Sequence, residues 1–261
     1  MRRCFYAALL FVSSNAVTQS PELVTDRPDQ TESAVTVPNG HAQVEMGMLL
    51  GEADGERTLN VATTLIRVGV HPRLELRLGV DGWVKTYEDE ESSGLGDGSV
   101  GLKLLLWGED ELRPQAALLA WTTLPIGASN VSTEHVDPGF RLSFSHTLSD
   151  RVGFGYNTGV VWETEVETGS RRIAATDSDT LATFQYTASL GITLTERWKY
   201  FIEVFGDIPL NASGGPAHSV DGGFTYLIHP NVQWDISGGA GLNDAADDWF
   251  VGTGISFRFP S

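Results

Sequence analysis

The chain of 261 residues contains a single cysteine, Cys4, so no disulfide can form within it. It also lacks an apolar run of the ~18 residues that a transmembrane helix requires, which excludes a helical membrane protein. Acidic residues outnumber basic ones by 34 to 17. The resulting net charge of −17 argues against a nucleic-acid partner, because nucleic-acid phosphates would be repelled.

Patterns for catalysis and metal binding are also scarce. Ser145 and His146 are neighbours, as are His218 and Ser219. Adjacent residues of a strand point to opposite faces, so neither pair can form a catalytic dyad. The sequence has no histidine pair at metal-ligand spacing and no phosphate-binding loop. We therefore expect no enzyme activity, no cofactor and no metal site.

The N-terminus carries an export signal. Arg2 and Arg3 precede an apolar run over residues 5–12, and Ser14-Asn15-Ala16 resembles a cleavage site. The pattern predicts a signal peptide over residues 1–16, since the run is too short to span a bilayer. An exported protein without disulfides needs another source of stability. A closed β-barrel, with every backbone group paired, would provide it.

Apolar and polar residues alternate along about a dozen segments, most clearly over residues 73–85. Leucine and valine occupy positions 74, 76, 78, 80 and 84, whereas charged residues occupy positions 73, 75, 77, 81 and 85. Period-two alternation places these two sets on opposite faces of a strand. Strands are predicted over residues 40–50, 58–70, 73–86, 98–107, 113–125, 139–148, 151–163, 181–194, 197–210, 218–228, 232–242 and 249–259.

The connections between these segments alternate between short and long. The short ones are 71–72, 108–112, 149–150, 195–196 and 229–231, and the long ones are 51–57, 87–97, 126–138, 164–180, 211–217 and 243–248. Outer-membrane barrels have short periplasmic turns and long outer loops, whereas a soluble sandwich has no reason to segregate its loops. The sequence therefore predicts an all-β fold, a transmembrane antiparallel up-and-down β-barrel of about 12 strands spanning residues 40–261.

Several short motifs resemble a family of bacterial outer-membrane proteins that is labelled as a meta-pathway of phenol degradation and often described as transporters. The motifs are residues 25–33 (TDRPDQTES), 37–40 (VPNG), 43–45 (QVE), 95–103 (LGDGSVGLK) and 124–127 (LPIG). The resemblance covers nearly the whole chain after residue 16. It implies export to the outer membrane of a Gram-negative cell and a porin-like barrel with a transport function.

The face that carries charge should line a wet lumen, because a charge in lipid costs a few kcal/mol. The predicted lumen-facing residues are Glu45, Arg67, Arg73, Glu75, Arg77, Asp81, Lys85, Lys103, Arg141, Lys199, Glu203, Asp207, Asp221, Asp235 and Arg258. Acids and bases are nearly balanced in this set. Two interpretations stay open: a narrow polar pore for small solutes, including aromatic or hydrophobic compounds, and a structural or surface-interaction barrel that ion pairs fill.

Residues 17–39 form an N-terminal segment with three prolines and no clear alternation. Glycines 239, 241, 252 and 254 leave a smooth stretch on the last two strands, beside the first strand. One hypothesis is that Asp26-Arg27-Pro28-Asp29 folds into the lumen along this wall and meets Arg258 or Asp235. The alternative is that the glycines only relieve crowding and let the strands bend.

The sequence thus predicts an outer-membrane channel or transporter with both termini in the periplasm. Its expected surroundings are outer-membrane lipid and lipopolysaccharide, and it is expected to be a monomer. Clustered acids in the outer loops could hold divalent cations against lipopolysaccharide, or could be simply solvated. No residue pattern in the sequence identifies the transported solute.

Overall fold

The computed structural model describes residues 21–87, 92–164, 180–212 and 215–260 as one antiparallel β-barrel. The predicted signal peptide, residues 1–16, lies outside the described residues. The strands are β1 (Ala42–Ala53), β2 (Glu56–His71), β3 (Leu74–Val80), β4 (Trp83–Tyr87), β5 (Ser92–Leu95), β6 (Gly98–Trp107), β7 (Gln115–Leu124), β8 (Pro138–Ser149), β9 (Val152–Thr164), β10 (Thr180–Thr193), β11 (Trp198–Pro209), β12 (Ala217–His229), β13 (Val232–Gly241) and β14 (Trp249–Phe259). Within these ranges no helix is long and apolar enough to cross a membrane.

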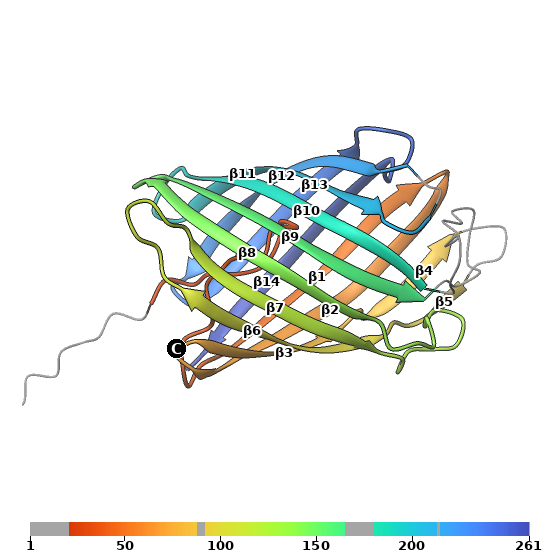
Figure 1. The fold of residues 1–261 in the computed structure, drawn as a ribbon, viewed down its shortest axis with the longest axis horizontal. Helices are drawn as coiled ribbons and strands as arrows, with labels where there is room; N and C mark the ends of the chain where they lie inside the picture. The colour runs from red at the N-terminus through yellow and green to blue at the C-terminus, as the bar shows by residue number, and fades with distance from the viewer. Residues whose placement is uncertain (1–20, 88–91, 165–179, 213–214, 261) are drawn as a thin grey trace, which may run out of the picture.

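Most strands that follow one another in the chain are hydrogen-bonded neighbours, and β1 closes the ring by pairing with both β2 and β14 (Figure 1). β2 pairs with β3 along one half of its length and with β4 along the other, so β3 and β4 form one barrel strand interrupted at Asp81-Gly82. β5 and β6 likewise form one strand interrupted at Gly96-Asp97. The closed barrel therefore has 12 strands, as the sequence predicted.

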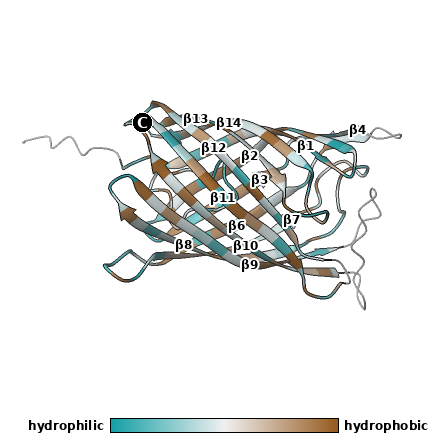
Figure 2. Ribbon diagram, turned by 90° about the horizontal axis from the view of Figure 1, so that it is seen from above, coloured by the Kyte–Doolittle hydropathy of each residue, from teal (hydrophilic) through white to brown (hydrophobic). Residues whose placement is uncertain are grey.

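Hydrophobic and hydrophilic residues alternate along the strands (Figure 2), and their exposures show an apolar outside and a polar inside. On β3, Leu76 and Leu78 are 47% and 51% exposed, whereas Glu75, between two outward positions, is 0% exposed. The largest fully buried side chains are mostly charged or amide-bearing, and include Arg67, Lys103 and Arg258. This inverted distribution is what lipid outside and a polar lumen inside require.

The short connections lie at one end of the barrel and most of the long ones at the other (Figure 1). Two predicted long loops are shorter than expected. β1 and β2 continue to a two-residue turn at Asp54-Gly55, whose φ angles of 53° and 86° fit the hairpin geometry that Asp-Gly favours. β4 and β5 extend into the predicted loop 87–97.

Two neighbouring strands, β2 and β3, are irregular at the same height of the barrel wall, and we call this irregularity the kink. Ala62 has a φ of 61° and forms a bulge in β2, and Gly82, with a φ of 73°, lies opposite it at the end of the β3 pairing. A Cβ on Gly82 would stand 2.2 Å from the carbonyl oxygen of Val61, so only glycine fits. The kink shifts the face on which the residues of β4 lie.

Candidate functional site: a lumen segment between two chambers

Residues 21–39, named here the lumen segment, lie inside the barrel (Figure 1). At its start, the guanidinium of Arg258 on β14 donates to the carbonyl oxygens of Pro21 and Glu22. At its end, the amide of Gly40 donates to the carbonyl of Gly69 on β2 (2.8 Å), where β1 follows. The segment therefore enters from the short-turn end, runs into the lumen and returns to the same end.

Asp26 anchors the lumen segment to the wall formed by β2, β3 and β6. Its carboxylate accepts from Lys103 Nζ at 2.8 Å and from Arg77 Nη1 at 2.6 Å, and lies 3.3 Å from Arg67 Nη1. Burial alone would raise the pKa of Asp26, but the charges of Arg67, Lys103 and Arg77 outweigh burial and hold this pKa well below its usual value. Asp26 is therefore a buried carboxylate that stays ionised.

Arg67 lies at the centre of the same network. It pairs with Glu45 at 2.8 Å and with Glu75 at 2.8 Å. The charge cluster comprises Asp26, Glu45, Arg67, Glu75, Arg77 and Lys103, so its three acids match its three bases. A buried ion network of this kind contributes little net stability, but removing one member leaves an uncompensated charge.

The segment also binds the opposite side of the lumen. Arg27 pairs with Asp235 of β13 at 3.1 Å, and its guanidinium lies directly over Gly47 and Gly254. A Cβ on either glycine would come within 2.4–2.6 Å of Arg27 atoms, so the missing side chains make room for the guanidinium.

The four glycines singled out from the sequence thus have different roles. Gly254 faces the lumen segment as hypothesised, but Gly239 faces Phe250 and Asp221. Gly241 faces the 242–248 connection, and Gly252 faces Leu49. The glycines that border the segment elsewhere are Gly69, against Val37 and Pro38, and Gly155, against Thr31.

The turning point of the segment reaches β9, β10 and β11. The amide of Gln30 donates to Glu203 Oε2 at 2.7 Å, and the Thr31 hydroxyl contacts Glu203 and the Thr187 hydroxyl (2.6 Å). The amide of Glu32 donates to Asn157 at 2.8 Å. The sequence did not point to Thr31, Asn157 or Thr187, because uncharged lumen residues have no mark that separates them from other strand residues.

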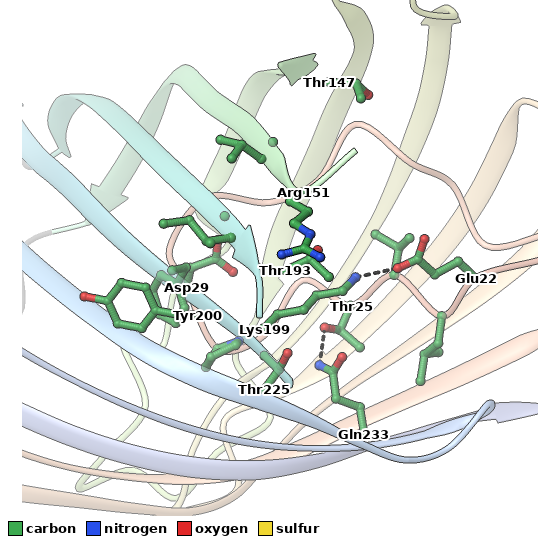
Figure 3. Close-up of a pocket in the computed structure, with 18 of the residues that line it drawn as sticks. Glu22, Thr25, Asp29, Thr147, Arg151, Thr193, Lys199, Tyr200, Thr225 and Gln233 are labelled. Atoms are coloured by element: carbon green, nitrogen blue, oxygen red, sulfur yellow. Dashed lines mark hydrogen bonds and ion pairs between the residues drawn. The ribbon is translucent and has the colours of Figure 1, made fainter. Parts of the chain in front are cut away.

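An inner chamber of about 380 Å³ opens beside the segment at the short-turn end (Figure 3). Its lining includes Asp29, Arg151, Lys199, Tyr200 and Thr225. Lys199 is neutralised by an ion pair with Glu22. The chamber is therefore polar and close to neutral in charge.

An outer chamber lies at the other end of the barrel and has two lobes, of about 240 and 380 Å³, that share Phe205, Ser219 and Asp247. Its further acidic lining residues are Glu52, Glu56, Glu163 and Asp207. Gln30 of the lumen segment lines the outer chamber, and its neighbour Asp29 lines the inner chamber. The segment is therefore the partition between the two chambers.

The structure brings most of the predicted lumen residues together inside the barrel. Buried positions hold Glu45, Arg67, Glu75, Arg77, Lys103, Glu203, Asp221, Asp235 and Arg258. Asp207 lines the outer chamber, and Arg141 reaches the lumen segment, with its guanidinium 3.9 Å from Glu32. The remaining predicted residues are Arg73, Asp81, Lys85 and Lys199; of these, Lys199 lies at the inner chamber.

Lys85 requires a correction. Its neighbour Val84 pairs with Asn60, which lines the outer chamber, so Lys85 points to the outside, where its ammonium stands 4.5 Å from the ring of Tyr87. The kink at Ala62 and Gly82 causes this change of face. Arg73 lies at the rim and donates to the carbonyls of Leu105 and Leu106, and Asp81 lies exposed at the interruption between β3 and β4.

Nothing in the described ranges groups three or more His, Cys, Asp or Glu side chains in a way that could hold a metal ion. The candidate functional features are the lumen segment, the charge cluster and the two chambers.

Comparisons with known proteins agree with this architecture. No protein in a search of curated sequences matches the chain. Among solved structures, the NanC porin is similar over 83% of this chain and 98% of that chain, with a TM-score of 0.55 and 10% identity. The translocator domain of the autotransporter NalP from Neisseria meningitidis is similar over 84% of this chain and 87% of that chain, with a TM-score of 0.50 and 10% identity. At these identities the likeness shows the fold alone, that of an outer-membrane β-barrel.

The sequence match extends further than the likeness in fold. Residues 25–259 match a single protein family, and this range takes in both the lumen segment from Thr25 onward and every strand of the barrel. The chain therefore belongs to the family described as "Putative MetA-pathway of phenol degradation".

Proposed function

We propose that the protein conducts small solutes across the outer membrane through the barrel lumen, and that the lumen segment restricts their passage. The observation that carries the proposal is the pair of chambers, one at each end of the barrel, separated where Asp29 and Gln30 cross the lumen. Barrels of more than about eight strands enclose space beyond what their own side chains fill, and here the segment takes up part of that space.

The family description names phenol degradation, so phenol-sized aromatic compounds are the first solutes to test. The chamber linings support a polar rather than a hydrophobic route for the solute. Each chamber also has an aromatic lining residue, Tyr200 in the inner chamber and Phe205 in the outer one. We propose a monomer in the outer membrane with both termini in the periplasm. Its outer surface would contact lipid and lipopolysaccharide.

A structural barrel without a conducting path is the second candidate function. The charge cluster favours it, because Asp26, Arg67 and Lys103 are buried and fill one side of the lumen with ion pairs. The two candidates differ in one measurable property, the conductance of the intact protein.

A disulfide between the segment and the wall tests the proposal. The hydroxyls of Thr31 and Thr187 lie 2.6 Å apart, and Cys4 lies in the predicted signal peptide, so Thr31→Cys with Thr187→Cys introduces the only cysteines after residue 16. Planar-bilayer recordings should show a smaller conductance, or a smaller open probability, in the oxidised form than in the reduced form. The expected difference is several-fold.

The two single-cysteine variants serve as controls, and neither should respond to oxidation. Equal, non-zero conductance of the oxidised and reduced double variant would show that solutes do not pass the segment. A complete lack of conductance in the wild-type protein, folded as judged by its resistance to detergent, would favour the structural barrel.

A further inference from the structure

The boundary between the two chambers is formed by residues that lie side by side on β11 and β12. On β11, Phe205 and Asp207 line the outer chamber, Phe201 and Lys199 line the inner chamber, and Glu203 lies between them. On β12, Ser219 lines the outer chamber and Thr225 the inner one, with Asp221 between. Glu203 and Asp221 are directly opposite each other in the strand pairing.

The lumen segment supplies the other side of this boundary. Asp29 lines the inner chamber, and Gln30, which donates to Glu203, lines the outer one. We name Asp29, Gln30, Glu203 and Asp221 the neck. Three of its four residues are carboxylic acids, contributed by the segment, β11 and β12.

No basic side chain of the described ranges forms an ion pair with any of the three acids. Arg27 is engaged by Asp235 of β13 at 3.1 Å. On β10 the neighbouring lumen residues are Thr187 and Ser189, which are uncharged. On β13 the residue facing Asp221 is Gly239. The neck is therefore a group of acids with no basic partner among the described residues, unlike the charge cluster.

Asp221 shows the lack of a basic partner most directly. Its side chain is buried, with 4% of the residue exposed, and its carboxyl group faces that of Glu203, with no amide or basic donor from the described part of the chain. A buried carboxylate without donors is strongly disfavoured, and it gains stability when a proton or another cation approaches. Rings of Asp and Glu use this effect in cation channels.

We propose that the neck is a cation-selective constriction, through which small monovalent cations and protonated amines pass in preference to anions. This inference rests on the proposed channel function and adds the charge class of the solute to it. Cations entering from the acidic outer chamber meet three carboxyl groups before reaching the inner chamber, whereas an anion meets a constriction that offers it no basic side chain.

The selectivity should depend on pH. Burial and the neighbouring charge of Glu203 raise the pKa of Asp29 well above its usual value. Acids placed this close together release their protons in coupled steps. The neck therefore carries less negative charge in acidic solution, and cation preference should increase as the pH rises.

The test is the reversal potential of the full-length protein in a KCl gradient. Wild type should prefer K⁺ over Cl⁻ several-fold in alkaline solution and less at about pH 5, because carboxyl groups release their protons as the pH rises. Glu203→Gln with Asp221→Asn keeps the size of both side chains and should remove most of the preference. Asp221→Asn alone, which leaves the hydrogen bonds of Glu203 to the lumen segment in place, should reduce it.

The matched control is Glu163→Gln with Asp207→Asn, which removes the same charge from the outer chamber and should change selectivity less. A conducting wild type with no preference for K⁺, or control and neck variants with equal effects, would overturn the neck as the selective constriction. An absence of any wild-type conductance would instead contradict the proposed channel function, so the two failures are distinguishable.

Discussion

Asp26 joins the lumen segment to three basic side chains on three different strands. Because its folded pKa is depressed, its contribution to docking is present above its ordinary pKa and is lost as the pH falls through the depressed value. Docking through Asp26 should therefore survive acidification to about pH 4 and weaken only below it.

Asp26→Asn should release the segment. The substitution leaves Arg67, Arg77 and Lys103 with one acid too few in a buried site, and breaking a buried ion pair costs about 3–5 kcal/mol. Hydrogen exchange of residues 21–39 should become faster, while the strands stay protected. Asp29→Asn is the matched control, because burial already disfavours the ionised form of Asp29, so the substitution should leave protection unchanged or stronger. Equal loss of protection in the two variants would contradict this assignment.

At the scale of the strand, a leucine-to-arginine substitution should destabilise the barrel much more on the outer face of the wall than on the lumen face. Leu78 of β3 is 51% exposed on the outer face, and Leu49 of β1 lines the outer chamber beside Glu52. Leu78→Arg should destabilise the barrel by about 2–4 kcal/mol, the cost of arginine near the middle of a bilayer. Leu49→Arg should cost much less, because it points toward water and acidic side chains.

Urea unfolding of both variants in lipid vesicles, followed by tryptophan fluorescence, measures the difference. The seven tryptophans of the chain provide the signal. Similar losses of unfolding free energy in the two variants would show that these faces are assigned incorrectly.

The alternation of residue types was sufficient to predict the barrel strands, because lipid and lumen impose opposite demands on successive residues. The change of face at Lys85 could not be predicted, since it depends on a bulge at Ala62 that shows no special residue type. The turn at Asp54-Gly55 could have been predicted from its Asp-Gly pair, but the acidic residues around it led to the prediction of a longer loop. The charge cluster was predictable as a set of lumen residues. Its pairing with Asp26 was not, because the path of the segment follows from contacts distant in sequence.

At the scale of the whole molecule, the segregation of the connections predicts orientation. Glu134 lies exposed in the long 125–137 connection at one end, whereas Glu111 and Glu196 lie exposed in short turns at the other. A glutamate-specific protease added to intact cells should therefore cut at Glu134 and spare Glu111 and Glu196, because short turns face the periplasm. Permeabilised cells provide the control, in which the short turns become accessible. Cleavage at Glu111 or Glu196 in intact cells would reverse the orientation.

The contacts of Arg258 and Arg27 have a consequence for assembly. β1 and β14, the first and last strands of the described ranges, pair with each other to close the ring. Arg258 of β14 binds the carbonyls of Pro21 and Glu22, and Gly254 of β14 accommodates Arg27, so residues that precede the first strand are held by the last one. The same stretch of β14 thus pairs with β1 and holds the start of the lumen segment, so we expect closure of the seam and docking of residues 21–27 to occur together.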